Sequence, residues 1–392
     1  MTSNPVISAL GRRLRLGVIG GGPGSFIGEV HRTAARLDDY YEVVAAVLSS
    51  DPARSRQTGR ALGIARSYAN IDELLQSESA RADGIDVVAI MTPNDSHYPL
   101  CCACLEQGLD IICDKPLTTS LDDALDLVQR VRKSGRVFCL THNYSGYPLA
   151  RQARAMVQAG LLGEIRMVHV TYVQGHNAAV VETDPPAGLR WRMQPDKAGA
   201  SLILGDIGSH AHHLACFVSG LQLTQICADV GAVIPQRQFD DYAGALLRFD
   251  NGARGVMWVT QAAAGAEHGL SIRVQGTKGG LEWQQEEPNH LKYMPLGQPV
   301  QVFSRGGPGL LPAAERATRV AIGHPEGFYE AFANLYADVA EAIIAQRSGR
   351  PADPLALDFP TVEDGARGMK FIEAALESSR SGGQWVDCTV TF

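Results

Sequence analysis

The chain has 392 residues, of which 45% are hydrophobic and 20% charged, and its formal net charge is −7. This composition is typical of a soluble globular protein and excludes the disordered and fibrous classes, and the length suggests two to three domains. A mildly acidic chain without a basic cluster offers no surface for nucleic acid or an anionic membrane. No apolar stretch approaches the roughly 18 residues of a membrane span. No apolar segment follows the Arg12-Arg13 pair, so we expect no export signal and a cytoplasmic protein.

Eight cysteines are too few for a disulfide framework in a chain of this length. Cys101, Cys102 and Cys104 form a cluster whose apolar surroundings favour one face of a helix behind a strand. A metal site is the alternative, but no second cysteine pair is placed to complete four ligands. We therefore predict no metal.

Short apolar runs alternate with helical patterns over the first 145 residues. The strands are expected at Leu14–Gly20, Tyr41–Leu48, Ile85–Met91, Asp110–Cys113 and Val137–Thr141, and the helices at Val30–Leu37, Ser55–Gly63, Ile71–Ser77, Tyr98–Glu106 and Leu121–Lys133. This alternation predicts an α/β domain with a parallel sheet over residues 1–145. Ligands of such sheets bind beyond the carboxyl ends of the strands.

The pattern changes in residues 146–392. A helix is expected at Pro148–Ala159, an irregular stretch at Gly175–Gly199, strands at Ile165–Val173, Leu223–Ile234, Tyr242–Phe249, Ala253–Ala263 and Leu270–Gln275, and closing helices at Pro325–Arg347 and Val362–Arg380. Asp250-Asn251-Gly252 is a strong hairpin turn signal. The sequence therefore predicts a second, α+β domain with a large, mostly antiparallel, open-faced sheet.

A glycine-rich loop follows the first expected strand and leads into a helix. Gly20 and Gly22 fit the G-x-G-x-x-G fingerprint, whereas the third glycine, Gly28, comes three residues late, which indicates an insertion around Pro23–Ser25. Such a loop lets the backbone approach a pyrophosphate at the helix N-terminus. An ordinary glycine-rich turn is the alternative, and Glu29 excludes a Walker loop. We expect a dinucleotide-binding Rossmann domain, with cofactor contacts from Gly20, Gly22, Ser25, Phe26 and Ile27.

The residues after the second strand bear on the choice of cofactor. An acidic side chain there would bind both ribose hydroxyls and select NAD. Ser49 holds that place, followed by Ser50, Asp51 and Arg54, and a small polar residue with an arginine could admit a 2′-phosphate. NAD and NADP are nearly even, with NAD slightly favoured. The later strand ends add further expected cofactor contacts: Thr92, Pro93, Asn94, His97, Asp114, Lys115 and Asn143.

Four motifs in order resemble one family. They are the glycine loop with His31, the T-P-N-x-x-H run from Thr92 to His97, the D-K-P run Asp114–Pro116, and the G-D-I-G-S-H run Gly205–His210. This order resembles the Gfo/Idh/MocA oxidoreductases, which include glucose–fructose oxidoreductase and inositol dehydrogenases, and the resemblance covers nearly the whole chain.

The resemblance implies that Lys115 reaches both the nicotinamide ribose and the reacting hydroxyl, and that Asp206 and His210 line the substrate. Their i, i+4 spacing agrees, because it places two side chains on one helix face. His213 continues that face, but many family members carry Asp there, which leaves its role open. Further expected substrate contacts are Tyr144, His176, Trp191 and Arg192.

Each site residue also has a structural alternative. Lys115 could be a solvated loop lysine, and Asp206 could be a helix N-cap. His210, His212 and His213 together could bind a metal. Tyr144 and His176, together with Tyr147, could simply pack in the core, and the Trp191-Arg192 pair could be a surface anchor.

The resemblance implies an NAD(P)-dependent dehydrogenase that oxidises a secondary hydroxyl of a cyclic polyol or pyranose sugar. His210 would be the general base, Lys115 would stabilise the alkoxide, and Asp206 would orient the imidazole or a neighbouring hydroxyl. Two alternatives are a nicotinamide-dependent glycosidase and a non-catalytic, dinucleotide-sensing regulator on the same fold. An open sheet and the resemblance both indicate a homo-oligomer, either a dimer or a tetramer.

Overall fold

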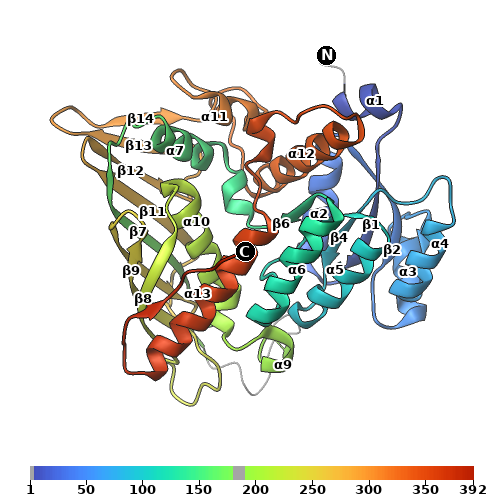
Figure 1. Ribbon diagram of the computed structural model, residues 1–392, viewed down its shortest axis with the longest axis horizontal. Coiled ribbons are helices and arrows are strands. Elements are labelled where there is room, and N and C mark those ends of the chain that lie inside the picture. Colours follow the sequence, from blue (N-terminus) through green and yellow to red (C-terminus); the bar gives the residue numbers. More distant parts are fainter. Residues whose placement is uncertain (1–3, 180–189) are drawn as a thin grey trace.

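The first sheet is parallel and lies on the right of Figure 1. The computed structural model describes residues 4–179 and 190–392. The strand order is β3-β2-β1-β4-β5-β6, so the chain starts in the middle of the sheet and returns to it before building the other half. Its strands are β1 (Leu14–Gly20), β2 (Tyr41–Val47), β3 (Arg66–Ser67), β4 (Val87–Met91), β5 (Asp110–Cys113) and β6 (Phe138–Leu140). This is the expected Rossmann arrangement, in which the strand order reverses between β1 and β4.

Helices cover both faces of this sheet because its strands are apolar on both sides. The helices between its strands, together with the one that precedes β1, are α1 (Pro5–Leu10), α2 (Phe26–Leu37), α3 (Pro52–Ala61), α4 (Ile71–Ser79), α5 (His97–Glu106) and α6 (Leu121–Ser134). Cys101 and Cys104 on α5 are fully buried in the core on one face of the sheet, as a packing role for this cluster predicts.

The second sheet has nine strands in the order β14-β13-β12-β11-β7-β10-β9-β8-β15. They are β7 (Ile165–Gln174), β8 (Leu223–Gly231), β9 (Tyr242–Phe249), β10 (Arg254–Thr260), β11 (His268–Gly276), β12 (Gly279–Gln284), β13 (His290–Pro295), β14 (Gln301–Ser304) and β15 (Val386–Asp387). Every pair is antiparallel except β7 with β10. The predicted turn joins β9 to β10, and the left-handed Gly252 (φ +86°) shows why glycine stands there.

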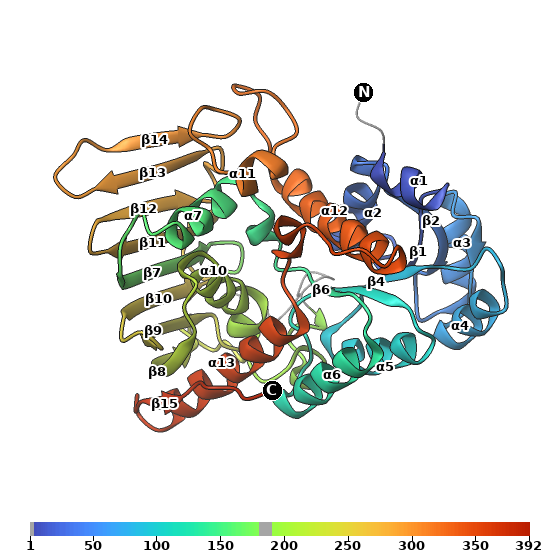
Figure 2. The ribbon, with the colours of Figure 1, turned by 45° about the horizontal axis from the view of Figure 1, so that its top comes forward.

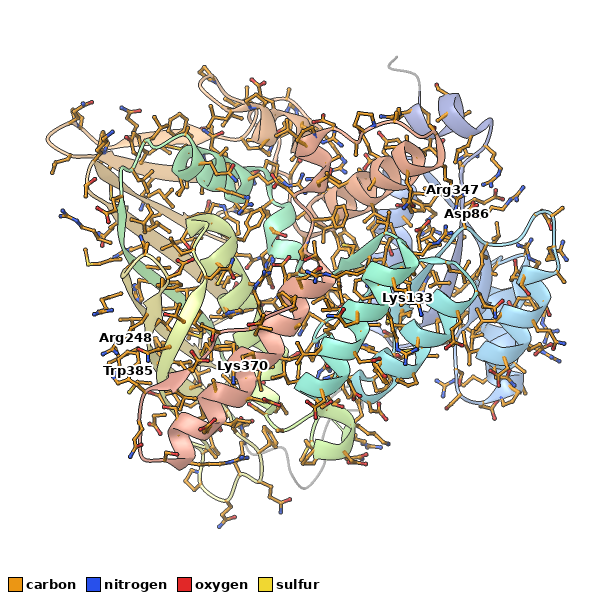
Figure 3. The ribbon with its side chains drawn as sticks, viewed as in Figure 1. Asp86, Lys133, Arg248, Arg347, Lys370 and Trp385 are labelled. Atoms are coloured by element: carbon orange, nitrogen blue, oxygen red, sulfur yellow. The ribbon has the colours of Figure 1, made fainter. Side chains whose placement is uncertain are left out.

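One face of this second sheet carries helices and the other is open over the part of the chain that the structure describes. Figure 2 shows the nine strands as a ladder with α7 (Pro148–Gln158), α10 (Ser209–Ser219) and α13 (Val362–Arg380) on the side toward the first sheet. At the edge, the Arg248 guanidinium lies 3.9 Å from the ring centre of Trp385, which precedes the short strand β15 (Figure 3). The open-faced α+β architecture agrees with the prediction.

The long helix α12 (Phe328–Arg347) links the two halves. It packs on α2, and its Phe332 and Tyr336 join the core of the first sheet. At its end, Arg347 pairs with Asp86 at 2.6 Å, next to the pair that Asp86 makes with Arg12 (Figure 3). The predicted boundary at residue 145 therefore separates the two sheets along the chain, but α12 returns to complete the first core.

Several elements differ from the sequence expectation. Helix α2 begins at Phe26, four residues earlier than expected, because Ser25 caps it by accepting a hydrogen bond from the Gly28 N–H (3.2 Å). The sequence did not predict α1, the short α9 (Pro195–Ala198) and α11 (Pro312–Ala317), or the strands β3 and β12 to β15, whose segments are short or interrupted by glycine and proline. Strands β8 and β10 end three residues before the predicted ends. Within the described residues, no helix is both long enough and apolar enough to cross a membrane.

Candidate active site

The glycine loop joins β1 to α2 with very close backbone contacts. A Cβ atom on Gly22 would lie 2.2 Å from the Leu48 carbonyl oxygen, and one on Gly28 would lie 2.2 Å from the Gly21 oxygen. The loop therefore needs glycine at these positions. Gly28 lets helix α2 pack closely against the loop backbone at Gly21, although it comes three residues later than in the G-x-G-x-x-G fingerprint. Phe26, the first residue of α2, is 67% exposed, and its ring centre lies 5.8 Å from that of Phe328 at the start of α12.

Ser49 and Ser50 follow directly after β2, where a ribose contact was expected. The Ser49 hydroxyl accepts a hydrogen bond from the Asp51 N–H at 3.1 Å. Asp51 in turn caps α3 by accepting from the Arg54 N–H at 2.7 Å. Arg54 is exposed on the first turn of this helix. The Asp51 carboxylate is thus hydrogen-bonded to the backbone of its own helix. Ser49 and Arg54 stay the side chains that are predicted to bear on the choice of cofactor.

The T-P-N-x-x-H run follows β4 and ends at His97, the first residue of α5. His97 in turn contacts the loop that follows β5. Thr92, Pro93 and Asn94 follow β4, and the Asn94 amide donates to the Ala198 carbonyl at 2.8 Å, which ties this end to the second half of the chain. His97 is fully buried, and its ring nitrogens face the Pro116 oxygen at 2.8 Å and the Thr92 oxygen at 3.0 Å. Both ring nitrogens lie within hydrogen-bond distance of a backbone oxygen, so His97 links the two loops, and its contact with a cofactor stays a prediction.

Lys115 leaves the end of β5 and reaches across to the second half of the chain. Its Nζ lies 3.1 Å from Oδ1 of Asp206 and also donates to the Asp206 carbonyl oxygen. The preceding Asp114 carboxylate accepts from the Lys115 N–H at 3.0 Å and from the Thr141 hydroxyl at 2.8 Å, which fixes the loop. A solvated loop lysine would make no such contacts, and only 14% of the Lys115 side chain is exposed.

Asp206 lies in a π-helical turn, Leu204–Gly208, that runs directly into α10. Such turns are rare, and many lie at functional sites. The Asp206 side chain caps no helix, since Ser201 and Asp240 accept the hydrogen bonds of the backbone N–H groups at this end. Oδ1 lies 3.7 Å from Nε of Arg192 as well as near Lys115. Burial alone would raise the pKa of Asp206, but these two cations hold it well below its usual range.

Gln261 is a site residue that the sequence analysis missed. It is fully buried just after β10, and its amide donates to Oδ2 of Asp206 at 2.7 Å. Its own oxygen accepts from the Asn177 amide at 2.9 Å, so the amide orientation is set. No local motif marks Gln261, because it lies 55 residues from Asp206 in the chain. The pairing of β10 with β9 and β7 brings the two side chains together. Asp206 is thereby held by partners on both of its oxygens.

His210 lies one turn further along α10 and is buried, with 7% exposed. Its ring meets Tyr144 edge to face, with centres 4.8 Å apart, and its Nδ1 lies 3.3 Å from Nδ1 of His142. Burial, followed by the positive charge of Lys115, lowers the pKa of His210 well below its ordinary value. A neutral imidazole can accept a proton. His142, which ends the loop after β6, was not predicted as a site residue.

The other two histidines of α10 point elsewhere. His213 stacks on His142 with ring centres 4.5 Å apart, and burial lowers its pKa to about 4. His212 stacks on Phe371 of α13 instead. Among the described residues, no three His, Cys, Asp or Glu side chains gather in a way that could hold a metal ion.

The remaining expected substrate contacts lie around Asp206 and His210. Tyr144 is buried, and its hydroxyl hydrogen-bonds that of Tyr172 on β7. The Arg192 guanidinium lies 4.7 Å from the Trp191 ring centre. His176 is exposed and lies within electrostatic range of Asp206 and Arg192. Part of the stretch expected to be irregular, residues 180–189, lies outside the described residues.

The residues present fit a dinucleotide. The close glycine contacts described above pack the loop against the chain that follows β2 and against the start of α2, as a dinucleotide-binding loop requires. Asn143, beside His142, is buried, and its amide nitrogen has no acceptor among the residues that the structure describes. Such a donor is costly unless a ligand or water accepts its hydrogen bond. A polar cofactor at this strand end would supply that acceptor.

Comparisons with known proteins agree with this geometry. Residues 14–142 match the oxidoreductase family with an NAD-binding Rossmann fold, and residues 150–282 match the GFO/IDH/MocA C-terminal domain. An oxidoreductase structure from Sinorhizobium meliloti is 45% identical, covers 96% of this chain and 99% of its own, and gives a TM-score of 0.86. An inositol dehydrogenase homolog from Azotobacter vinelandii, complexed with NADH and myo-inositol, is 36% identical over 97% of this chain and 98% of its own, with a TM-score of 0.88.

A further relative is the levoglucosan dehydrogenase of Pseudarthrobacter phenanthrenivorans, which is 26% identical over 72% of this chain and 76% of its own length. The two matched regions together span most of the chain and include both the glycine loop and the Asp206–His210 turn. The chain therefore belongs to the Gfo/Idh/MocA family of NAD-binding oxidoreductases.

Proposed function

We propose that this protein is an NAD(P)-dependent dehydrogenase that oxidises a secondary hydroxyl of a cyclic, inositol-type polyol or a pyranose sugar to the ketone or lactone. The observation that carries the proposal is the contact of Lys115 with Asp206 beside the buried His210, where the ends of the parallel strands meet the second sheet. The names of the inositol- and levoglucosan-binding relatives support the substrate class. Residues 1–145 would bind the cofactor, and residues 146–392 would bind substrate and form the oligomer.

The cofactor would be held along the carboxyl edge of the first sheet. The residues for this role are Gly20, Gly22, Ser25, Phe26, Ile27, Ser49, Ser50, Arg54, Thr92, Pro93, Asn94, His97, Asp114, Lys115 and Asn143. A bound nicotinamide supplies the hydride acceptor. NAD and NADP are nearly even, because Ser49 neither binds both ribose hydroxyls as a carboxylate would nor repels a 2′-phosphate. NAD is slightly favoured, since the structures of the inositol dehydrogenase homolog and of levoglucosan dehydrogenase are complexes with NAD+ or NADH.

The protein's own groups would handle the proton and the developing charge. His210, neutral because its pKa is low, takes the proton of the substrate hydroxyl. Lys115 donates to the oxygen as it gains negative charge, and it can do so because Asp206 and the carbonyl beside it aim its ammonium group. Gln261 holds Asp206 in that position. Tyr144, His176, Trp191 and Arg192 would contact the remaining hydroxyls.

A screen of inositols and aldoses with NAD and with NADP, followed by the absorbance of the reduced cofactor, tests this proposal. We expect reduction with at least one cyclic polyol or pyranose. Release of sugar from a glycoside without net reduction would instead identify a nicotinamide-dependent glycosidase. Cofactor binding without turnover of any substrate in the screen would favour the regulator.

A further inference from the structure

His142 and His210 share a hydrogen bond whose direction matters for the chemistry of His210. The two Nδ1 atoms lie 3.3 Å apart, and the rings are nearly perpendicular, at 82°, with centres 5.1 Å apart. Both side chains are buried, with 2% and 7% of their surfaces exposed. Burial keeps the pKa of each well below the ordinary value, so both rings are neutral.

A neutral imidazole carries one N–H, so a single proton lies between the two Nδ1 atoms. If His210 donates, its Nε2 has a free lone pair and can accept a proton. If His142 donates, the proton of His210 is on Nε2, and this ring cannot act as a base there. The hydrogen bond thus selects between an active and an inactive form of His210.

The state of His210 after it has taken up a proton shows which direction of this hydrogen bond is compatible with the reaction. An imidazolium donates from both nitrogens, so the Nδ1 of His142 must then be the acceptor. Only the arrangement in which His210 already donates reaches that state without moving a second proton. Histidine tautomers are generally set in this way, by the hydrogen bond of the other ring nitrogen.

The fold holds His142 rigidly for this role. Its N–H donates to the Leu140 oxygen at 2.8 Å, and its carbonyl accepts from the Ser145 hydroxyl at 2.9 Å. Its ring stacks on that of His213 at an angle of 8° and meets the His210 ring edge to face. The acceptor therefore cannot turn away from His210 without breaking this packing.

We propose that His142 is a positioning residue whose Nδ1 accepts a hydrogen bond from the Nδ1–H of His210, which leaves Nε2 of His210 as the atom that accepts the substrate proton. In this step the hydroxyl proton moves to Nε2, the Nδ1 proton stays on His210, and no proton passes to His142. The inference rests on the proposed function, in which His210 is the base.

Three variants test it in kinetics. His142→Phe keeps an aromatic ring but removes the acceptor, and we expect kcat to fall about 10- to 100-fold with KM changed less than about twofold. His142→Asn places a carbonyl oxygen on Cγ, where Nδ1 was, and should restore most of the rate. His212→Phe makes the same exchange on an α10 histidine that stacks on Phe371 instead, and its kcat should stay within about threefold of the parent.

A second measurement needs no turnover. The ring nitrogens of His210 are observed by NMR in the ¹⁵N-histidine-labelled, full-length protein and assigned by their loss in His210→Gln. We expect the Nδ1-protonated form in the parent and in His142→Asn, and a shift toward the Nε2-protonated form in His142→Phe.

The outcomes separate the two proposals. An Nε2-protonated His210 in the parent, or an unchanged tautomer in His142→Phe, overturns the role of His142 even if the enzyme oxidises polyols. If no polyol or sugar is oxidised but the tautomers behave as expected, the proposed function fails and the positioning by His142 stands. If His142→Phe does not fold, the parent and His142→Asn spectra still decide the direction of the hydrogen bond.

Discussion

The two sheets of this protein use their faces differently. The first is covered by helices on both faces, so a ligand reaches it at the strand ends, and its carboxyl edge is built from loop backbone and helix caps. The second is covered on one face, and its contribution to the site comes from side chains on α10 and β10. Under the proposed function, the cofactor half (residues 1–145) is thus made of local features along the chain, whereas the substrate half (residues 146–392) is made of long-range contacts.

The largest losses of kcat should come from replacing His210 in the substrate half. His210→Ala should lower kcat by about 10² to 10⁴, the usual range for a lost general base. Asp206→Asn should cost less, and the double variant should lose little beyond His210→Ala, because residues that act as one unit are not additive. Steady-state kinetics of the three variants check this. Fully additive losses, with a destabilised Asp206→Asn variant, would refute the shared role.

Lys115 links the two halves through its contact with Asp206. Removing its positive charge tests whether that charge stabilises the alkoxide. Lys115→Met keeps the aliphatic stem, and we expect kcat to fall roughly 10²-fold because a donor to the developing alkoxide is lost. Lys133→Met, an exposed lysine on α6 (Figure 3), is the matched control and should leave the rate unchanged. Near-normal turnover in Lys115→Met would move this lysine to a structural role.

Acid should weaken the second half more than the first. Burial lowers the pKa of His213 to about 4 and that of His212 to about 3, both on α10, and His31 on α2 also has a pKa of about 4. Since these values lie below the unfolded value of about 6.5, the unfolded chain binds more protons between pH 6.5 and 4. The contribution of these neutral histidines to the free energy of unfolding is therefore complete above pH 6.5, and it is lost as the pH falls from 6.5 to 4.

Each such histidine should reduce the free energy of unfolding by about 2 kcal/mol at pH 5. Thermal melts at pH 7 and pH 5 measure the loss, and His213→Phe should melt with less dependence on pH than the parent. An equal Tm at both pH values would show that these rings are not neutral and buried.

The open face of the second sheet should be covered by another copy of the chain. Met167, Leu246, Val256 and Trp258 lie on it with 43% to 51% of their surfaces exposed, and Val256 pairs directly with Leu246. An apolar sheet face of this kind is typical of an interaction surface. We expect a dimer or tetramer by light scattering at micromolar concentration, and Val256→Lys should shift it toward the monomer. Leu62→Lys, at an equally exposed leucine of the first half, is the control; a monomeric parent would exclude the interface.

The smallest effect concerns cofactor choice in the first half. Ser49→Asp should raise the ratio of NAD to NADP efficiency about tenfold, because a carboxylate repels a 2′-phosphate. Ser50→Asp, one residue further along and exposed, should change the ratio less. No rise in Ser49→Asp would mean that Ser49 does not face the ribose.

Much of the first half could be predicted from the sequence because its signals are local. Alternating apolar runs predicted the five longer strands of the first sheet, and the glycine loop and the D-K-P run identified the strand ends where Gly22 and Lys115 lie. The start of α2 was misplaced because the Ser25 cap was not recognised as a helix start. The contacts of His97 with the backbone oxygens of Thr92 and Pro116 were not predicted, because its place in the motif does not show which loops fold against it.

The sequence by itself determined the fold class and the side chains at the strand ends, since these depend on periodicity or spacing within a short segment, and the order of its four motifs carried the resemblance to the family. Only the tertiary structure decided what surrounds Asp206 and His210. Gln261 and His142 are 55 and 68 residues away from their partners in the chain, and sheet pairing and helix packing alone bring them into hydrogen-bond distance. The low pKa values of the buried histidines follow from the same packing, because desolvation depends on every element that covers a ring and not on its sequence neighbours.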